Sequence, residues 1–452
     1  MPEPPTGRLE PALVEWYRAA MRDCMSSPEP GNDAEIRRIG TEVEETLERG
    51  DPPPLAIRRR IAHFRAIQAR RDPPSEPPAS KRFLGRFRGL IRGRIAKRPY
   101  HAGHRVDVPA TRVLHAIVDL RIGGAQQLVI DLVRTAPVGG RHEVLAQNVR
   151  VRFEPGVPYR EVPANRSAIE RAFDRIDPEL VHVCHYHADL SRRAWYELVF
   201  DVAITRRIPV VQSHCVIGDP WMGSDRQHLV FCSAWSRDRS AVAGIPDSVI
   251  SPGTPIDLFQ EDRRPLSGTP HVGMVYRLDG DKIDRSSGDV IARILEMNPT
   301  ATMTVVGDGV VRPQILEILE RRGVSDRVEW RGFIPFERLP EVYRAFDLAI
   351  APVLADTFGS GSVHAICAGT PVCGYAVAAI PSILRHDAAI IPNGDAEAFA
   401  RGATRILTDD RLHEEVHRTQ LDHAVRNFSI EGMCASYHTL FRDSIARSPR
   451  SA

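Results

Sequence analysis

The sequence predicts an α/β protein with two doubly wound, Rossmann-like domains that face each other across a cleft, preceded by a mainly helical extension. The chain has 452 residues, more than one hydrophobic core usually supports. After residue 110, short β-branched segments alternate with helical stretches, which is typical of βαβ units in a parallel sheet. A turn-rich break at 260–270 separates two such series. We therefore expect domains over 111–260 and 261–430, followed by a C-terminal helix and tail over 431–452.

Short strands are predicted at regular intervals in both domains. In the first domain we expect them over 112–118, 144–149, 180–184, 209–213, 229–232 and 248–250. In the second domain we expect them over 271–276, 302–306, 328–330, 348–351, 372–375 and 389–391. The stretches between them have the length and spacing of helices, so each domain is expected to be a parallel sheet covered by helices.

Residues 1–80 are predicted to form a proline-rich, helical N-terminal extension. Helices are expected over 12–25, 33–49 and 55–71, and each is followed by a run of prolines. Proline lacks the backbone N–H that a helix interior needs, so these runs end the helices and stiffen the connections.

Residues 81–110 are predicted to form a basic amphipathic linker. Residues 81–98 carry eight basic side chains and no acidic one, with apolar residues such as Phe83, Phe87 and Ile91 at helical spacing. Such a helix lies on an anionic membrane surface, so we expect residues 81–105 to contact one. Three glycines weaken the helix. The alternative is a solvated linker that packs on the main body.

The charge distribution and the cysteine spacing indicate which kinds of partner and which cellular compartment to expect. The first 110 residues carry a net charge of +6 and the remainder −4, so nucleic acid is not expected as a partner of the main body. The seven cysteines are scattered without a paired CxxC spacing, which indicates reduced thiols. Neither a signal peptide nor a long apolar run is visible. We expect a cytoplasmic protein, peripheral on the inner face of the membrane if residues 81–105 bind lipid.

Two glycine-containing loops are candidates for binding phosphate. In doubly wound sheets, ligands lie beyond the carboxyl ends of the strands. Gly123 and Gly124 follow the first predicted strand and open a helix, where backbone N–H groups and the helix dipole favour an anion. A plain tight turn explains the glycines equally well. Residues 356–362 (Asp-Thr-Phe-Gly-Ser-Gly-Ser) lead into another helix, although ordinary N-capping by serine explains part of this pattern.

Two cations follow the strand predicted over 271–276. They are Arg277 and Lys282, and Lys282 is the only lysine after residue 110 in a chain with 57 arginines. A compact ammonium group acts as a point charge on a diphosphate. The alternative is an ordinary surface lysine.

Histidines gather at the ends of two predicted strands. Alternation along a strand places His182 and Cys184 on one face and His185 and His187 on the other, so a metal site is not expected. His214 ends the next strand and is expected to hydrogen-bond a sugar hydroxyl or a phosphate in the cleft. The other histidines are expected to have core or capping roles.

Residues 111–445 resemble the glycosyltransferase family 4 type of retaining transferase, a group with the GT-B fold. Several motifs occur in the family's order, which is stronger evidence than any single motif. They are Gly123-Gly124-Ala125, His214, residues 231–235, Gly253, residues 256–259, Arg277, Lys282, residues 306–309 and residues 331–334.

The resemblance implies a glycosyltransferase that moves a sugar from a nucleoside-diphosphate sugar to a glycan, lipid-linked or small-molecule acceptor, with retention. The nucleotide sugar is a substrate, and no cofactor or metal is implied. The implied donor-binding residues are Gly123, Gly124, Arg277 and Lys282 near the diphosphate, Phe333 and Ile334 near the nucleobase, and Gly359, Ser360, Gly361 and Ser362 in the anion-binding loop.

The sequence departs from the family at one motif. Relatives carry two glutamates separated by seven residues, which contact the donor sugar and the ribose; Asp356 and His364 stand at these positions here. Aspartate keeps the charge with a shorter reach, and histidine can hydrogen-bond a ribose hydroxyl without offering a carboxylate. We assign His214 and Asp356 as the catalytic residues and His364 to donor binding.

Two other functions are alternatives to sugar transfer. The first is a non-catalytic GT-B relative that binds a sugar nucleotide or scaffolds glycan assembly. In this alternative, the altered motif reflects the absence of catalysis. The second is an NAD-type oxidoreductase, but no GxGxxG fingerprint opens either domain.

Overall fold

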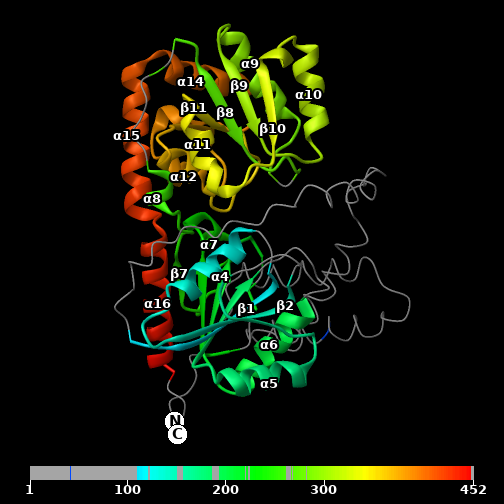
Figure 1. Ribbon diagram of the computed structural model, residues 1–452, viewed down its shortest axis with the longest axis vertical. Helices are drawn as coiled ribbons and strands as arrows, with labels where there is room; N and C mark the ends of the chain where they lie inside the picture. The colour runs from blue at the N-terminus through cyan, green and yellow to red at the C-terminus, as the bar shows by residue number, and fades with distance from the viewer. Residues whose placement is uncertain are drawn as a thin grey trace, which may run out of the picture. The chain divides into compact units, whose positions relative to one another are not determined.

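The structure is a computed structural model that describes residues 41, 109–120, 123–149, 156–185, 193–218, 220–221, 224–260, 266, 268–280 and 282–448. The described residues from 109 to 448, apart from Trp221, belong to one compact unit, which contains both sheets (Figure 1). Apart from Thr41 and residues 109–110, the predicted extension and basic linker lie outside the described residues. The helices predicted there and the membrane contact of residues 81–105 stay predictions.

The first sheet has seven parallel strands in the order β3-β2-β1-β4-β5-β6-β7. The strands are β1 (Arg112–Leu120), β2 (Arg141–Val149), β3 (Tyr159–Glu161), β4 (Leu180–His185), β5 (Val210–His214), β6 (Gln227–Phe231) and β7 (Asp247–Val249). The helices of this half are α4 (Gly124–Arg134), α5 (Arg166–Ile176), α6 (Arg193–Thr205), α7 (Ala234–Ser240) and α8 (Ile256–Phe259). The predicted strands are confirmed to within a few residues, whereas β3 was not predicted.

The second sheet has six parallel strands in the order β10-β9-β8-β11-β12-β13. The strands are β8 (His271–Val275), β9 (Thr302–Val306), β10 (Val328–Gly332), β11 (Leu348–Ala351), β12 (Val372–Tyr375) and β13 (Ile390–Ile391). Its helices are α9 (Ser286–Met297), α10 (Arg312–Arg321), α11 (Leu339–Arg344), α12 (Ser360–Cys367), α13 (Ile380–Leu384), α14 (Ala396–Thr408) and α15 (Asp410–Asn427). Three short 3₁₀ turns also occur, η4 (Ser325–Arg327), η5 (Phe336–Arg338) and η6 (Asp387–Ala389).

The strand order decides where a ligand can bind. In each sheet the order reverses beside the first strand, between β1 and β4 in one and between β8 and β11 in the other. Such a reversal leaves a crevice at the carboxyl ends of the two strands, where doubly wound proteins bind ligands. Gly123 follows β1, Arg277 follows β8, and residues 356–362 follow β11. The predicted phosphate loops therefore lie at these reversal points.

The last helix, α16 (Ile430–Ala446), packs on the first sheet although it follows the second in sequence (Figure 1). Its buried side chains, among them Met433, Tyr437 and Phe441, belong to the same hydrophobic core as β1 and α4. This apolar face explains why the helix crosses back, because burying it removes large aromatic side chains from water.

The two chain segments that connect the halves are paired with each other. The Thr254 N–H donates to the carbonyl of Phe428 at 2.7 Å, and the Ile430 N–H donates to the carbonyl of Thr254 at 3.2 Å. A Cβ atom on Gly253 would lie 2.5 Å from the Cα atom of Ile430. The close backbone approach therefore requires glycine at position 253.

We predict that Gly253→Ala destabilises the protein by about 1–3 kcal/mol, because the added methyl group meets backbone that cannot move away cheaply. Urea unfolding followed by circular dichroism measures the change. Gly268→Ala is the matched control, since a Cβ atom there would meet nothing within 4 Å. Equal stability of the two variants would contradict the prediction.

A chain of buried polar side chains crosses the first sheet beneath α16. It runs through His142, His115, His182, Ser213 and Tyr437, with successive distances of 3.0, 2.9, 2.8 and 2.8 Å. Alternation along β4 places His182 here, on the face that α16 covers, so its expected core role is confirmed. The network satisfies polar groups that would otherwise be costly to bury.

Burial keeps these histidines neutral. It lowers the pKa of His142 and of His182 from 6.5 to about 3, with the neighbouring His438 adding to the effect. Burial also lowers the pKa of His438 to about 4. An unfolded chain binds protons at the ordinary pKa, so below pH 6.5 the unfolded state takes up more protons than the folded state.

We predict that the folded state loses stability as the pH falls below about 6.5, by roughly 1.4 kcal/mol per pH unit for each histidine that stays neutral. The slope of unfolding free energy against pH, measured by urea titration between pH 7 and 5, checks this. His438→Gln removes one such group, so its slope should be smaller by about one proton. A variant with the wild-type slope would contradict the assignment.

Candidate functional site

Lys282 and Asp356 form an ion pair at the carboxyl edge of the second sheet. The Lys282 Nζ atom donates to Asp356 Oδ1 at 2.9 Å, and the two side chains are 27% and 12% exposed. The same oxygen accepts from the Gly359 N–H at 3.0 Å and from the Phe358 N–H at 3.4 Å. Asp356 therefore connects the lysine that follows β8 with the loop that follows β11.

The loop turns into α12 at Gly359. This residue has φ of 96°, in the left-handed region that favours glycine. A Cβ atom there would lie 2.9 Å from the Cδ1 atoms of Ile380 and Ile383. The first turn of α12, which contains Ser360 and Gly361, presents backbone N–H groups and the positive end of the helix dipole.

Ser362 points inward from α12. Its Oγ atom lies 3.2 Å from the Tyr276 hydroxyl, and the residue is 1% exposed. Burial, with the nearby Asp356 carboxylate, raises the pKa of Tyr276, so the phenol keeps its proton. Within the predicted Gly-Ser-Gly-Ser segment, Ser362 thus fastens the start of α12 to the end of β8.

Arg277 follows Tyr276 and lies at the surface. Its guanidinium donates to Asp279 Oδ2 at 2.8 Å, and its side chain is 58% exposed. An exposed ion pair contributes little to stability, so the guanidinium can turn to a ligand at small cost.

The turn after β9 explains how the Arg277 segment is held. A Cβ atom on Gly307 would lie 2.0 Å from the carbonyl oxygen of Tyr276, and the residue has φ of 120°. The Leu278 N–H donates to the carbonyl of Asp308 at 3.1 Å. Glycine at position 307 therefore permits the close approach of two backbone segments beneath Arg277.

Phe333 and Ile334 follow β10 at the same edge of the sheet. Phe333 is 72% exposed, whereas Ile334 packs against the core. An aromatic ring held out from the carboxyl edge offers a flat apolar surface for stacking.

His364 lies in an aromatic cluster. Its ring stacks on Phe259 with centroids 4.8 Å apart at 15°, and meets the edge of Phe336 at 5.2 Å. Phe259 ends α8, so the half-buried His364 contacts the segment that leads into the second half. The sequence alone does not predict the role of Phe336 or this stacking, because an isolated phenylalanine does not indicate which side chain it will contact.

Gly123 and Gly124 lie at the start of α4. A Cβ atom on Gly123 would meet the Gln126 Oε1 atom at 2.4 Å, whereas one on Gly124 would meet nothing within 4 Å. The Gln126 side chain folds back to donate to the Asp119 carbonyl at 3.1 Å. The backbone at Gly124 is therefore open to an approaching group.

His214 ends β5 and is 2% exposed. Its ring stacks on Phe231 of β6 at 5.3 Å and 29°. The next residue, Cys215, accepts a hydrogen bond at its carbonyl from Thr357 Oγ1 at 3.0 Å. The residue next to His214 therefore contacts the loop that carries Asp356.

Two contacts made by cysteine Sγ atoms connect Cys215 to the residue after the first glycine pair. Cys215 and Cys184 have Sγ atoms 3.9 Å apart, and Cys184 Sγ donates to the Ala125 carbonyl at 3.6 Å. The structure therefore connects the Gly123-Gly124 loop, the end of β5 and residues 356–362. The sequence indicated Thr357 only as part of the candidate anion loop and Cys184 only as a neighbour of the strand histidines, because no local pattern shows which distant group each of them contacts.

The described residues contain neither a metal-binding cluster nor a membrane-spanning helix. In the part of the chain that the structure describes, no group of three or more His, Cys, Asp or Glu side chains is arranged to hold a metal ion. None of the helices in these described ranges combines the length and apolar character that crossing a bilayer requires.

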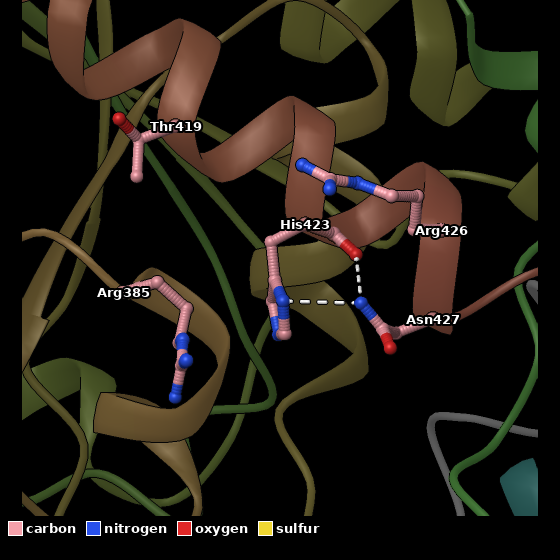
Figure 2. A pocket seen from close by; sticks show the side chains of 5 residues that line it. All are labelled: Arg385, Thr419, His423, Arg426 and Asn427. Carbon is pink, nitrogen blue, oxygen red and sulfur yellow. Dashed lines mark hydrogen bonds between the residues drawn. The ribbon is translucent and has the colours of Figure 1, made fainter.

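A cavity of about 470 Å³ lies elsewhere, at the end of α15 and the turn after α13 (Figure 2). It is lined by Arg385, Thr419, His423, Arg426 and Asn427. Figure 2 shows the Asn427 amide donating to the carbonyl and the Nδ1 atom of His423, at 2.8 and 3.1 Å. The cavity contains none of the predicted site residues.

We predict that Asp356→Ala loosens the loop more than Asp356→Asn, because asparagine keeps an oxygen that accepts from the Gly359 N–H. Hydrogen exchange followed by mass spectrometry checks this at residues 358–359. Exchange should be roughly tenfold faster in the alanine variant, which corresponds to the loss of about 1.4 kcal/mol of hydrogen bonding. Identical exchange in both variants and the wild type would contradict the bonding described for Oδ1.

A family model and several curated relatives match part of the chain. Residues 269–409 match the family model described as "Glycosyl transferases group 1". A 2-deoxystreptamine N-acetyl-D-glucosaminyltransferase of Streptomyces fradiae is 32% identical over 190 residues, which is 39% of this chain and 44% of the relative. A D-inositol 3-phosphate glycosyltransferase of Mycolicibacterium smegmatis is 27% identical over 242 residues, 50% of this chain and 54% of the relative. The chain spans about half the length of the curated relatives it matches.

Solved structures resemble the fold along most of the chain. Sucrose-phosphate synthase from Thermosynechococcus elongatus superposes with a TM-score of 0.60 at 16% identity, over 74% of this chain and 99% of that one. Anabaena HepE in complex with UDP-glucose also gives 0.60 at 16% identity, over 74% of this chain and 100% of that one. The described residues therefore have the GT-B fold, and the segment that carries Lys282 and the Gly359 loop matches the group 1 glycosyl transferases.

Proposed function

We propose that the chain is a retaining glycosyltransferase that moves a sugar from a nucleoside-diphosphate sugar to an acceptor hydroxyl. One observation carries this proposal. Lys282, Asp356 and the Gly359 turn are joined by hydrogen bonds at the reversal point of the second sheet, beside the exposed Arg277. This constellation lies within the residues that match the glycosyl transferase family model.

The diphosphate of the donor would bind between two cations and two helix starts. Lys282 and Arg277 supply positive charge, and the first turns of α12 and α4 supply backbone N–H groups. These groups stabilise the negative charge that grows on the diphosphate as the sugar leaves. The acceptor hydroxyl would attack from the side of the departing phosphate, which gives retention. Because the two side chains neutralise the diphosphate, we propose no metal ion or other cofactor.

Asp356 and His214 are proposed to orient the donor sugar. Asp356 does so through the lysine and the loop N–H groups that its Oδ1 atom holds. His214 is fixed against Phe231 at the end of β5, one residue before the contact with Thr357. Both residues would therefore hold the sugar in place relative to the leaving phosphate.

The nucleoside is proposed to lie along the edge formed by Phe333 and α12. The exposed Phe333 ring offers a stacking surface to the base, next to Ile334. His364 would hydrogen-bond a ribose hydroxyl, with its ring orientation set by Phe259 and Phe336.

The relatives suggest where to look for the substrates. Structures of Anabaena HepE contain UDP and UDP-glucose, so we propose a uridine nucleotide sugar as the first donor to test. Two matched relatives are named for 2-deoxystreptamine and inositol 3-phosphate, which are both cyclitols. Within the glycan, lipid-linked and small-molecule acceptors expected from the sequence, we therefore place cyclitols first. We also propose a cytoplasmic location.

The purified full-length chain should bind a nucleotide sugar and transfer or slowly hydrolyse its sugar. A panel of uridine, guanosine, adenosine and thymidine diphosphate sugars, assayed by release of the nucleoside diphosphate, tests this with and without cyclitol acceptors. Binding without turnover would favour a non-catalytic relative. Neither binding nor turnover with any donor would refute the proposal.

We predict that Lys282→Met weakens UDP binding by roughly 10- to 100-fold, since it removes a cation from the diphosphate. Isothermal titration calorimetry measures the dissociation constant. Arg321→Met is the matched control, because Arg321 is an exposed cation on α10 that pairs with Glu317. If both variants bind UDP as the wild type does, Lys282 is not a diphosphate ligand.

A further inference from the structure

The loop residue Thr357 makes three hydrogen bonds to residues of the first half. Its Oγ1 atom donates to the Cys215 carbonyl at 3.0 Å. Its own carbonyl accepts from Ser233 Oγ at 2.7 Å and from Cys232 Sγ at 3.5 Å. Thr357 therefore contacts both the end of β5 and the turn between β6 and α7.

The partners of Thr357 are held firmly. Ser233 is the N-cap of α7 and is 5% exposed, and its Oγ atom accepts from the Ser236 N–H at 3.2 Å. Its hydroxyl proton has two acceptors within reach, the Thr357 carbonyl at 2.7 Å and Ser236 Oγ at 3.2 Å, and the Thr357 carbonyl is the nearer one. Burial raises the pKa of Cys232 to about 11, so its thiol keeps a proton to donate. A fixed donor set of this kind defines the position of the Thr357 peptide.

The residues on either side of Thr357 are fastened to other elements. Asp356 pairs with Lys282, and the Phe358 ring meets the edge of Phe428 with centroids 5.2 Å apart. Of these three consecutive residues, Thr357 is the one bonded to Cys215, the residue that follows His214. The hydroxyl of Thr357 thus relates the phosphate-binding loop to the strand end that carries His214.

We infer that Thr357 is a positioning residue that fixes the donor loop in register with His214, through its bonds to Cys215 and Ser233. The inference rests on the proposed function, in which His214 orients the sugar and the loop holds the diphosphate. Displacing reacting groups by about 1 Å can slow a reaction roughly 100-fold. The diphosphate ligands themselves are untouched by the loss of the Thr357 hydroxyl, so nucleotide affinity depends on it little.

The experiment compares Thr357→Val, which has nearly the same shape without the hydroxyl, with Thr357→Ser, which keeps it. With the best donor found, kcat of the valine variant should fall about 10- to 100-fold, while KM for the donor and Kd for UDP change less than about threefold. The serine variant should recover most of kcat. Thr357→Ala serves as a second variant if the valine protein does not fold, as judged by circular dichroism.

A second readout does not depend on activity. Cys232 and Cys215 can be labelled with a maleimide, and the labelling of each site followed by mass spectrometry. Labelling should be faster in Thr357→Val than in the wild type and in Thr357→Ser, because loss of the bond to the Cys215 carbonyl loosens the loop residue that also accepts from Cys232 Sγ. Wild-type kcat and wild-type labelling in the valine variant would overturn the inference. So would a loss of UDP affinity equal to the loss of kcat. If the wild type binds no nucleotide, the proposed function fails instead, and the labelling still reports whether the Thr357 contact exists.

Discussion

The charge of Lys282, in the segment that follows the buried strand β8, is the constraint on which the site depends. The lysine is only 27% exposed and needs a counter-charge, which Asp356 supplies at 2.9 Å. Because the same carboxylate oxygen accepts from the Gly359 N–H, the charge and the loop geometry are set together. A diphosphate entering the site would share the ammonium group with Asp356 and meet an α12 helix start that is already in position. In the proposed function, this arrangement preorganises the site for the diphosphate.

The fold also connects the loop that pairs with Lys282 to the first half of the chain. Parallel strands bring the ends of β8 and β11 to one edge, so Arg277 and the 356–362 loop both follow strands that end at that edge. The paired crossings at Thr254 and Phe428, together with α16 on the first sheet, tie the halves to one another. Thr357 adds hydrogen bonds from the loop to the end of β5 and to the turn between β6 and α7. Donor loop and first sheet are thus linked by the backbone crossings and by side chains.

The sequence allowed most of the architecture to be predicted, for a physical reason. Strands buried on both faces require runs of β-branched residues, and such runs are visible without a structure. The short edge strand β3 was missed because Tyr159, Arg160 and Glu161 have no apolar pattern. The predicted phosphate-binding loops follow strand ends. They lie at the reversal points because the strand order of each parallel sheet determines where those points occur. The roles of the site residues themselves stay predictions.

Contacts between distant segments could not be predicted. Thr357 and Cys215 are 142 positions apart, and Ser213 and Tyr437 are 224 apart. Nothing in a local pattern says which hydroxyl meets which carbonyl. The stacking of His364 on Phe259 is similar, because it depends on how α8 packs against α12. Such contacts follow from tertiary packing, and they are the ones that fix the geometry of the site.

A crystal structure of the protein with UDP tests the central claim most directly. The diphosphate should lie against Lys282 Nζ and the first turn of α12, with the Asp356 to Gly359 hydrogen bond retained and Arg277 turned toward the phosphates. A nucleotide bound elsewhere, for example in the basic cavity at Arg385 and Arg426, with the Lys282 to Asp356 pair unchanged, would contradict it.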